Sequence, residues 1–131
     1  MLGGFPAAAT IAVSDLDRAR RFYEDVLGLE AKMEDPGGIM YGSGDTMVLV
    51  YPSQFAGTSQ ATVATWMVAD LDAAVDDLTS KGVTFEQYDM EGLKTDERGI
   101  ATLGDEGIRG AWFKDPDGNI LNVGEGPMSG S

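Results

Sequence analysis

The sequence predicts an α+β fold made of two tandem β-α-β-β-β modules, whose curved sheets enclose a cavity. The first observation is a repeat: residues 13–19 (VSDLDRA) and 68–74 (VADLDAA) match at a constant offset of 55 residues. The second is that each run follows an apolar, strand-like segment and opens a helical pattern that ends at a glycine, Gly28 or Gly82. A fixed period indicates repeated structural units that pack side by side.

The first helix has recognisable start and stop signals. Residues 7–13 form a strand of small and β-branched residues, and Ser14 then serves as the predicted N-cap, with Asp17 at the capping-box spacing. Gly28 is the predicted C-terminal cap. Between them, apolar residues recur at three- and four-residue intervals, which is typical of one buried helical stripe: Leu16, Ala19, Tyr23, Val26 and Leu27.

The remaining elements follow from alternating or β-branched runs bounded by turn residues. In the first module we expect strands at 30–33, 38–42 and 46–51. In the second module we expect a strand at 61–68, a helix at 71–80, and strands at 83–88, 100–103, 109–114 and 120–123. The predicted domain is the whole chain, 1–131, with module one at about 5–52, a linker at 53–60 and module two at about 61–124.

The composition excludes several classes of protein. No apolar run approaches the ~20 residues that span a bilayer, and the first residues have neither a basic start nor a long apolar stretch, so no secretory signal is expected. The chain has no cysteine, hence no disulfide and no thiolate chemistry, which suits a cytoplasmic location.

The net charge of −13 bears on partners. Such a field repels nucleic acid phosphates and anionic membrane surfaces, so we expect neither as a partner. It attracts cationic ligands, although the same charge also serves solubility alone.

The two repeats and the last turn together resemble the vicinal oxygen chelate superfamily, which includes glyoxalases, ring-cleaving dioxygenases, fosfomycin-resistance enzymes and bleomycin-resistance binding proteins. The resemblance covers nearly the whole chain and implies the two-module fold. The segments that carry it are 11–19, 22–23, 26–28, 68–72, 81–83 and 113–119.

The resemblance also identifies the positions at which metal-using relatives hold their ion. In this sequence those positions fall on Ala8, Val63 and Asn122, with a further carboxylate position at Val48. A catalytic transition metal needs about three nitrogen or carboxylate ligands, and the chain has no histidine at all. This departure from the family predicts a protein without a metal or other cofactor. A site made of carboxylates alone is the alternative among the 22 acidic residues, but nothing places three of them on the strand positions that face the cavity.

Because strand side chains alternate, the former ligand positions indicate which residues face the cavity. By the same alternation Ile11 and Trp66 point towards the helices. The inward set on the strands is Ala8, Thr10, Val48, Val50, Val63, Thr65, Met67 and Asn122.

Three further groups complete the candidate ligand site. Trp112 offers a flat surface for stacking if its neighbour Phe113 packs under a helix; ordinary core packing is the alternative. Tyr41 lies on a middle strand and lines the mouth. The polar loop 89–99 is long enough to act as a lid through Met90 and Leu93, or is a solvated crossover.

The function expected is metal-free binding of a small hydrophobic or aromatic molecule, which the charge allows to be cationic. A metal-independent lyase, isomerase or cyclase of the same fold is one alternative, and a non-catalytic interaction module is another. We expect no enzyme of the serine type, since no histidine is present to activate a serine and no Gly-x-Ser-x-Gly elbow occurs. Exposed sheet edges and the resemblance both imply a homodimer.

Overall fold

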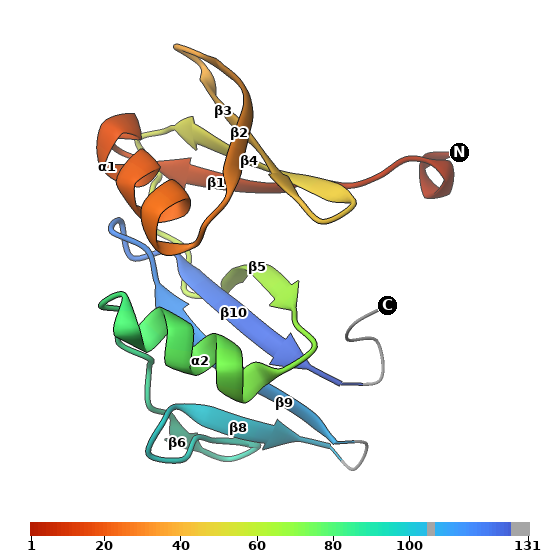
Figure 1. The fold of residues 1–131 in the computed structure, drawn as a ribbon, viewed down its shortest axis with the longest axis vertical. Coiled ribbons are helices and arrows are strands. Elements are labelled where there is room, and N and C mark those ends of the chain that lie inside the picture. The colour runs from red at the N-terminus through yellow and green to blue at the C-terminus, as the bar shows by residue number, and fades with distance from the viewer. Residues whose placement is uncertain (105–106, 127–131) are drawn as a thin grey trace. The chain divides into compact units, whose positions relative to one another are not determined.

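A computed structural model of the chain describes residues 1–104 and 107–126. It contains two four-stranded sheets, each accompanied by a helix, in the α+β order expected from the repeat (Figure 1). Contacts divide the chain into two compact units. The first comprises residues 1–64 and 115–119, and the second comprises 65–114 with the described residues from 120 onward.

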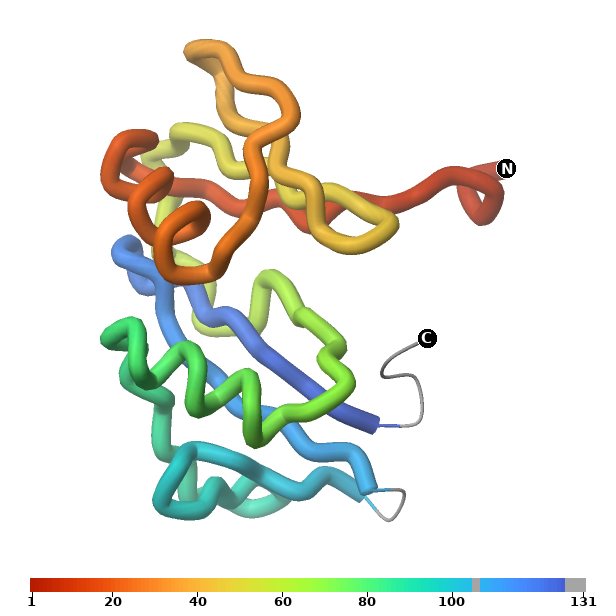
Figure 2. Tube along the Cα trace, viewed as in Figure 1, coloured from red at the N-terminus to blue at the C-terminus, as the bar shows by residue number. Residues whose placement is uncertain are grey.

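The first unit begins with a short 3-10 turn, Leu2–Gly4, in a segment that runs out beyond the sheet (Figure 2). Its sheet has the order β1-β4-β3-β2, with β1 parallel to β4 and the other pairs antiparallel. The elements are β1 (Ala9–Val13), α1 (Leu16–Arg20) continued by a π-helical segment (Arg21–Val26), β2 (Glu30–Asp35), β3 (Gly38–Ser43) and β4 (Thr46–Pro52).

The N-cap of α1 is Asp15, and the prediction of Ser14 was wrong. The Asp15 carboxylate accepts hydrogen bonds from the backbone N–H groups of Asp17 and Arg18 at 2.9 and 3.1 Å. The Ser14 backbone N–H and hydroxyl instead donate to the Asp117 carboxylate at 3.1 and 2.5 Å. A residue 103 positions away thus engages the side chain that the local spacing had assigned to the helix.

The second unit repeats the sheet order as β5-β10-β9-β8. Its elements are β5 (Thr62–Met67), α2 (Leu71–Ser80), a small hairpin of β6 (Asp89–Met90) and β7 (Leu93–Lys94), β8 (Ile100–Leu103), β9 (Ile108–Lys114) and β10 (Ile120–Glu125). Asp70 caps α2 by accepting from the Ala73 N–H at 3.1 Å. No helix among the described residues is long and apolar enough to cross a membrane.

Two predictions for the second unit were wrong. Residues 83–88 form no strand; Glu86 donates its N–H to the Trp112 carbonyl at 2.8 Å, while β8 already pairs with β9 from Ile100 onward. The loop 89–99 is not irregular throughout, because β6 and β7 pair within it.

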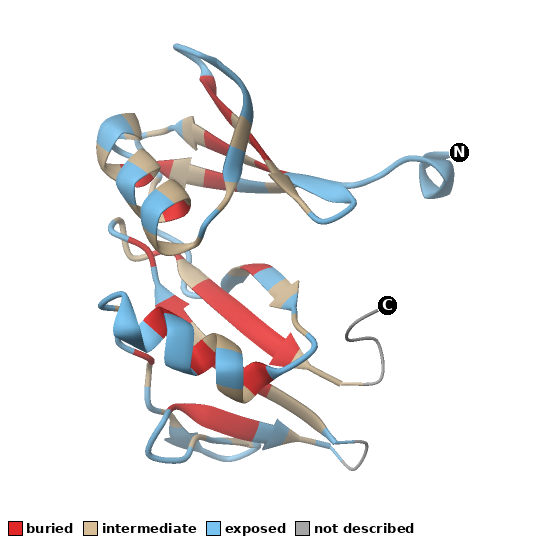
Figure 3. Ribbon diagram, viewed as in Figure 1, coloured by how far each residue is buried: buried red, intermediate tan, exposed pale blue. Residues whose placement is uncertain are grey.

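Each unit has its own apolar core (Figure 3). In the first unit the core lies between α1 with its π-helical continuation and one face of the sheet, where the rings of Tyr23 and Tyr41 stack at 6.3 Å. In the second, Val75 of α2 and Leu121 of β10 are buried, and Phe85 meets Phe113 edge to face at 5.6 Å.

The turn 115–119 is embedded in the first unit. Asp115 and Asn119 are 5% and 4% exposed. The Tyr23 hydroxyl donates to the Asp115 carboxylate at 2.7 Å, and the Asn119 amide donates to the Ala12 carbonyl at 2.7 Å. These buried polar groups are therefore satisfied by partners from the first module's strand and helix.

Candidate ligand-binding faces

In the first unit, the sheet face away from the helix carries a row of apolar side chains that crosses all four strands. The pairings Thr10 with Leu49, Leu49 with Met40, and Met40 with Met33 place these four residues side by side. We call this row, Thr10, Leu49, Met40 and Met33, the first open face. Met33 is 69% exposed, and none of the other three is fully buried.

Three residues expected to line the cavity lie instead on the helix side of the same sheet. Val48 pairs with Ala9 and Tyr41, whose ring stacks on helical Tyr23, and Val50 pairs with Ile11. Tyr41, Val48 and Val50 are all almost fully buried. The structure does not place these three residues on the open face. For Val48 and Val50 the register of β4 is offset by one residue from the expectation, and a one-residue offset exchanges the faces. Tyr41 on β3 pairs with Val48 and therefore shares its face.

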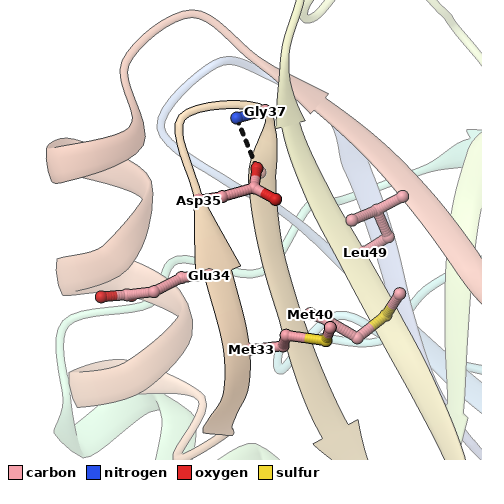
Figure 4. A pocket seen from close by; sticks show the side chains of 7 residues that line it. Met33, Glu34, Asp35, Gly37, Met40 and Leu49 are labelled. Atoms are coloured by element: carbon pink, nitrogen blue, oxygen red, sulfur yellow. Dashed lines mark hydrogen bonds between the residues drawn. The ribbon is translucent and has the colours of Figure 1, made fainter.

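Two grooves flank the first open face. One lies beside the predicted residue Ala8, encloses about 430 Å³, and includes Met40, Met47 and Lys32 in its lining. The other encloses about 210 Å³ at the β2–β3 turn and is lined by Met33, Glu34, Asp35, Gly37, Gly38, Met40 and Leu49 (Figure 4).

In the second unit, the corresponding face is built around Trp112. Trp112 pairs with Asn122 across β9 and β10, and Gly110 pairs with Gly124 two residues further along, on the same face. The far end of the indole lies 3.5 Å from where a Cβ of Gly110 would stand. We call Trp112, Asn122, Gly110, Gly124 and Met67 the second open face.

Met67 completes that face above the glycines. Its sulfur lies 3.4 Å from the place of a Cβ on Gly124, and the side chain is 47% exposed. Asn122 is only 8% exposed and donates its amide N–H to the Ala111 carbonyl at 3.1 Å. The two glycines thus leave room for an indole and a thioether to lie against the sheet.

The neighbours of Trp112 show how the strand alternates. Phe113 is 1% exposed and packs on Phe85 in the core, whereas Trp112 is half-buried on the opposite face. The ring of Tyr88 meets the indole edge to face at 5.9 Å.

The other predicted residues are distributed as follows. On β5, Thr65 is exposed like Met67, while Val63 is half-buried. Met90 and Leu93 pair with each other in the β6–β7 hairpin, where Met90 is 55% exposed. Ala8, Thr10 and Val63 belong to the first unit, and the other predicted residues on open surfaces belong to the second: Thr65, Met67, Met90, Leu93, Trp112 and Asn122.

Sequence reasoning missed Met33, Leu49 and the glycines of the second open face. A β-bulge between Ala31 and Met33 changes which residues of β2 face each side of the sheet. The residue types in this segment do not predict the bulge. Gly110 and Gly124 could have been found, because a glycine inside a strand pattern often marks a close approach of another group.

The residues at the former metal positions do not fit a transition metal. Within residues 1–104 and 107–126 no three histidine, cysteine, aspartate or glutamate side chains converge as a metal site would require. Val48 lies on the helix face. The β4 residues that share the open face with Thr10 are Met47 and Leu49. The corrected register therefore supplies no carboxylate either.

Three tyrosines have raised pKa values. Burial is the main cause for Tyr23, followed by the adjacent Asp115 carboxylate, and for Tyr41, followed by the hydrogen bond to Glu24. Burial also raises the pKa of Tyr88. These phenols remain protonated at neutral pH, and those of Tyr23 and Tyr41 donate hydrogen bonds to Asp115 and Glu24.

The fold and the open faces define the class of protein: a chain of two β-α-β-β-β units, each with a sheet face that no helix covers. The family model of the Glyoxalase/Bleomycin resistance protein/Dioxygenase superfamily matches residues 6–123, and the chain belongs to that superfamily. A search of curated proteins finds no match.

Solved structures with the same fold include proteins of different activities. A glyoxalase family protein from Enterococcus faecalis aligns with a TM-score of 0.71 at 20% identity, covering 95% of this chain and 100% of that one. A lactoylglutathione lyase from Agrobacterium tumefaciens gives 0.68 at 22%, covering 96% of each chain. An antibiotic-binding protein from Streptomyces sp. CB03234 gives 0.63 at 18%, covering 93% and 97%. At these identities the likeness establishes the fold alone.

Proposed function

We propose that this chain binds a small apolar or aromatic molecule, without a metal ion, on the open faces of its sheets. The observation that carries the proposal is the second open face, where the Trp112 indole lies against Gly110 and the Met67 sulfur lies against the paired Gly124. A flat ring and a polarisable thioether at the surface of a sheet provide contact area for a planar ligand. The proposed contact residues are Ala8, Thr10, Val63, Thr65, Met67, Met90, Leu93, Trp112 and Asn122.

The choice of exposed residues supports binding over simple solubility. Within the described strands, the large hydrophobic side chains that are most exposed are all methionines: Met33, Met47, Met67 and Met90. Unbranched methionine adapts to ligands of different shape and is overused at promiscuous binding surfaces. Asn122 adds one buried amide that can orient a polar group of the ligand.

Two further observations support this proposal: the residues at the former metal positions are poor metal ligands, and one protein of the same fold is described as binding an antibiotic. The uncharged Asn122 amide is a weak metal ligand, and its N–H donates to the Ala111 carbonyl. The Streptomyces relative is described as an antibiotic-binding protein. Turnover of any tested compound by the purified chain would replace binding with a metal-independent enzymatic function, such as that of a lyase, isomerase or cyclase.

Tryptophan fluorescence tests the site directly, because Trp66 and Trp112 are the two tryptophans of the chain. In Trp66→Phe, where only Trp112 emits, titration with riboflavin or proflavine should quench the emission in a saturable way. Trp112→Ala should weaken binding of the same compound by ~1–3 kcal/mol, the scale of a stacked aromatic anchor. The loss is measured by calorimetry.

Trp66→Phe is the matched control, since it also removes an indole while leaving the second open face in place. Both variants must give the same circular dichroism spectrum as the wild type. Equal affinity of wild type and a folded Trp112→Ala variant would remove Trp112 from the site.

A further inference from the structure

We propose that the groove at the β2–β3 turn, which adjoins the first open face, is a site distinct from the second open face and selects organic monocations with an apolar body. This site lies in the first unit and goes beyond the binding of aromatic molecules on the second open face. We call it the Asp35 groove; Figure 4 shows the side chains of Met33, Met40, Leu49 and Asp35 in its lining, which also includes Gly38.

Gly38, in the lining of the groove, is a position where a side chain would not fit. Its φ of 151° is in the range that side chains rarely adopt, and a Cβ there would stand 2.8 Å from the Val50 carbonyl oxygen and 3.3 Å from the Tyr51 Cβ. Gly38 thus allows β3 to approach β4 closely, and Met33, Met40 and Leu49 border the adjacent space of about 210 Å³. The walls are therefore two flexible thioethers and one branched aliphatic side chain.

The charge in the groove comes from Asp35. Its Oδ1 accepts a hydrogen bond from the Gly37 N–H at 2.7 Å, which fixes the carboxylate at the tip of the turn. Asp35 follows Met33 by two residues on β2 and points to the same side as the methionines (Figure 4). Within the described part of the chain, no lysine or arginine lies within ion-pair distance of Asp35.

The neighbouring charged groups are already paired. Glu34 points to the helix side, where its carboxylate meets the Arg20 guanidinium at 2.6 Å (Figure 4). The Lys32 ammonium lies 3.3 Å from the Glu30 carboxylate. Asp35 is thus the carboxylate in this groove that remains available to a ligand cation.

These features together specify the ligand class. An ammonium group beside Asp35 gains an ion pair, and its apolar body loses water against the two methionines and the leucine. The net charge of −13 raises the local concentration of cations and disfavours anions. A neutral molecule of the same size gains the apolar contact alone.

The experiment compares 4-phenylbutylamine, cationic at pH 7, with the uncharged 4-phenylbutanol. The protein is labelled with ¹³C at its methionine methyl groups, so that Met33 reports on the Asp35 groove alone, Met40 on this groove and the neighbouring one, Met47 on the neighbouring groove, and Met67 on the second open face. We expect the amine to shift the Met33 and Met40 signals and to bind roughly two- to fivefold more tightly than the alcohol, the effect of one exposed ion pair. The preference should shrink as salt is added.

Asp35→Asn is the decisive variant, because asparagine keeps an oxygen for the Gly37 N–H while losing the charge. It should bind amine and alcohol about equally. Asp25→Asn removes one exposed carboxylate elsewhere in the first unit and should keep the wild-type preference.

Equal affinity of the two ligands in the wild type, or the same preference in Asp35→Asn and Asp25→Asn, would overturn the proposal. If the amine leaves the Met33 and Met40 signals unchanged while aromatic ligands still quench Trp112, this proposal fails and the proposed function holds. If the amine shifts those signals while Trp112 is not quenched, this site holds and the proposed function of the second open face fails.

Discussion

At the scale of single residues, Asp115 organises the polar interior of the first unit. Its two carboxylate oxygens accept hydrogen bonds from the Tyr23 hydroxyl, from the backbone N–H groups of Asp117 and Asn119, and from the Asn119 amide. A buried carboxylate is tolerated because each lone pair finds a donor. This explains why Asp115 and Asn119, at the two ends of a turn, are buried although Pro116 between them is exposed.

Removing one of these donors should destabilise the protein. Tyr23→Phe leaves the Asp115 carboxylate with one fewer hydrogen bond, and we expect a loss of ~1–3 kcal/mol in the free energy of unfolding. Chemical denaturation measures this loss. Tyr51→Phe removes a half-buried hydroxyl from the same unit and should change stability by less; equal losses in the two variants would contradict the role assigned to Tyr23.

At the scale of elements, the start of α2 is tied to the end of β10. The Glu125 carboxylate accepts a hydrogen bond from the Leu71 N–H at 2.9 Å and pairs with the Arg109 guanidinium at 2.9 Å. The backbone N–H first, and Arg109 second, hold the pKa of Glu125 below its ordinary value. An anion at the first turn of a helix is also favoured by the helix dipole.

This link predicts a pH dependence of stability. Because the folded-state pKa is lowered, the contribution of Glu125 is fully present above the unfolded-state pKa and is lost as the pH falls through the folded value. Glu125→Gln should therefore be less stable than wild type at pH 7, and the difference should shrink below about pH 4. Thermal melts from pH 7 to pH 3 measure it.

Glu91→Gln is the matched control, since it neutralises an exposed glutamate of the β6–β7 turn. It should track the wild type at every pH. A Glu125→Gln deficit that stays constant down to pH 3 would show that the carboxylate charge is not what stabilises the start of α2.

At the scale of the whole molecule, the absence of histidine predicts independence from metals. After gentle purification, elemental analysis should find transition metals well below one ion per chain. Addition of Zn²⁺ or Ni²⁺ should neither raise the melting temperature nor produce glyoxalase activity. About one tightly held transition-metal ion per chain would contradict this prediction.

The chain should also form a homodimer whose stability increases with salt. Two copies that each carry −13 repel one another, and this repulsion is screened over roughly 8–10 Å at physiological ionic strength. Light scattering at tens of micromolar protein should show a shift towards twice the chain mass as salt is raised. A 13.9 kDa particle at both low and high salt would disprove the dimer.

The sequence by itself determined the fold class, because the 55-residue repeat and its helix signals are local patterns that need no knowledge of distant contacts. It also showed that histidine and cysteine, two common ligands of transition metals, are lacking, since no register can supply a residue that the chain does not contain. These conclusions rest on residue types alone, and a small error in strand boundaries leaves them unchanged.

Only the tertiary structure decided which strand residues share a face. The register of β4 moved Val48 and Val50 to the helix side, and the bulge in β2 brought Met33 next to Met40. The N-cap was likewise decided at a distance, because Asp117 engages Ser14 and leaves Asp15 to cap the helix. Pairing between strands and contacts across a hundred residues are set by packing energy, which the local sequence pattern does not encode.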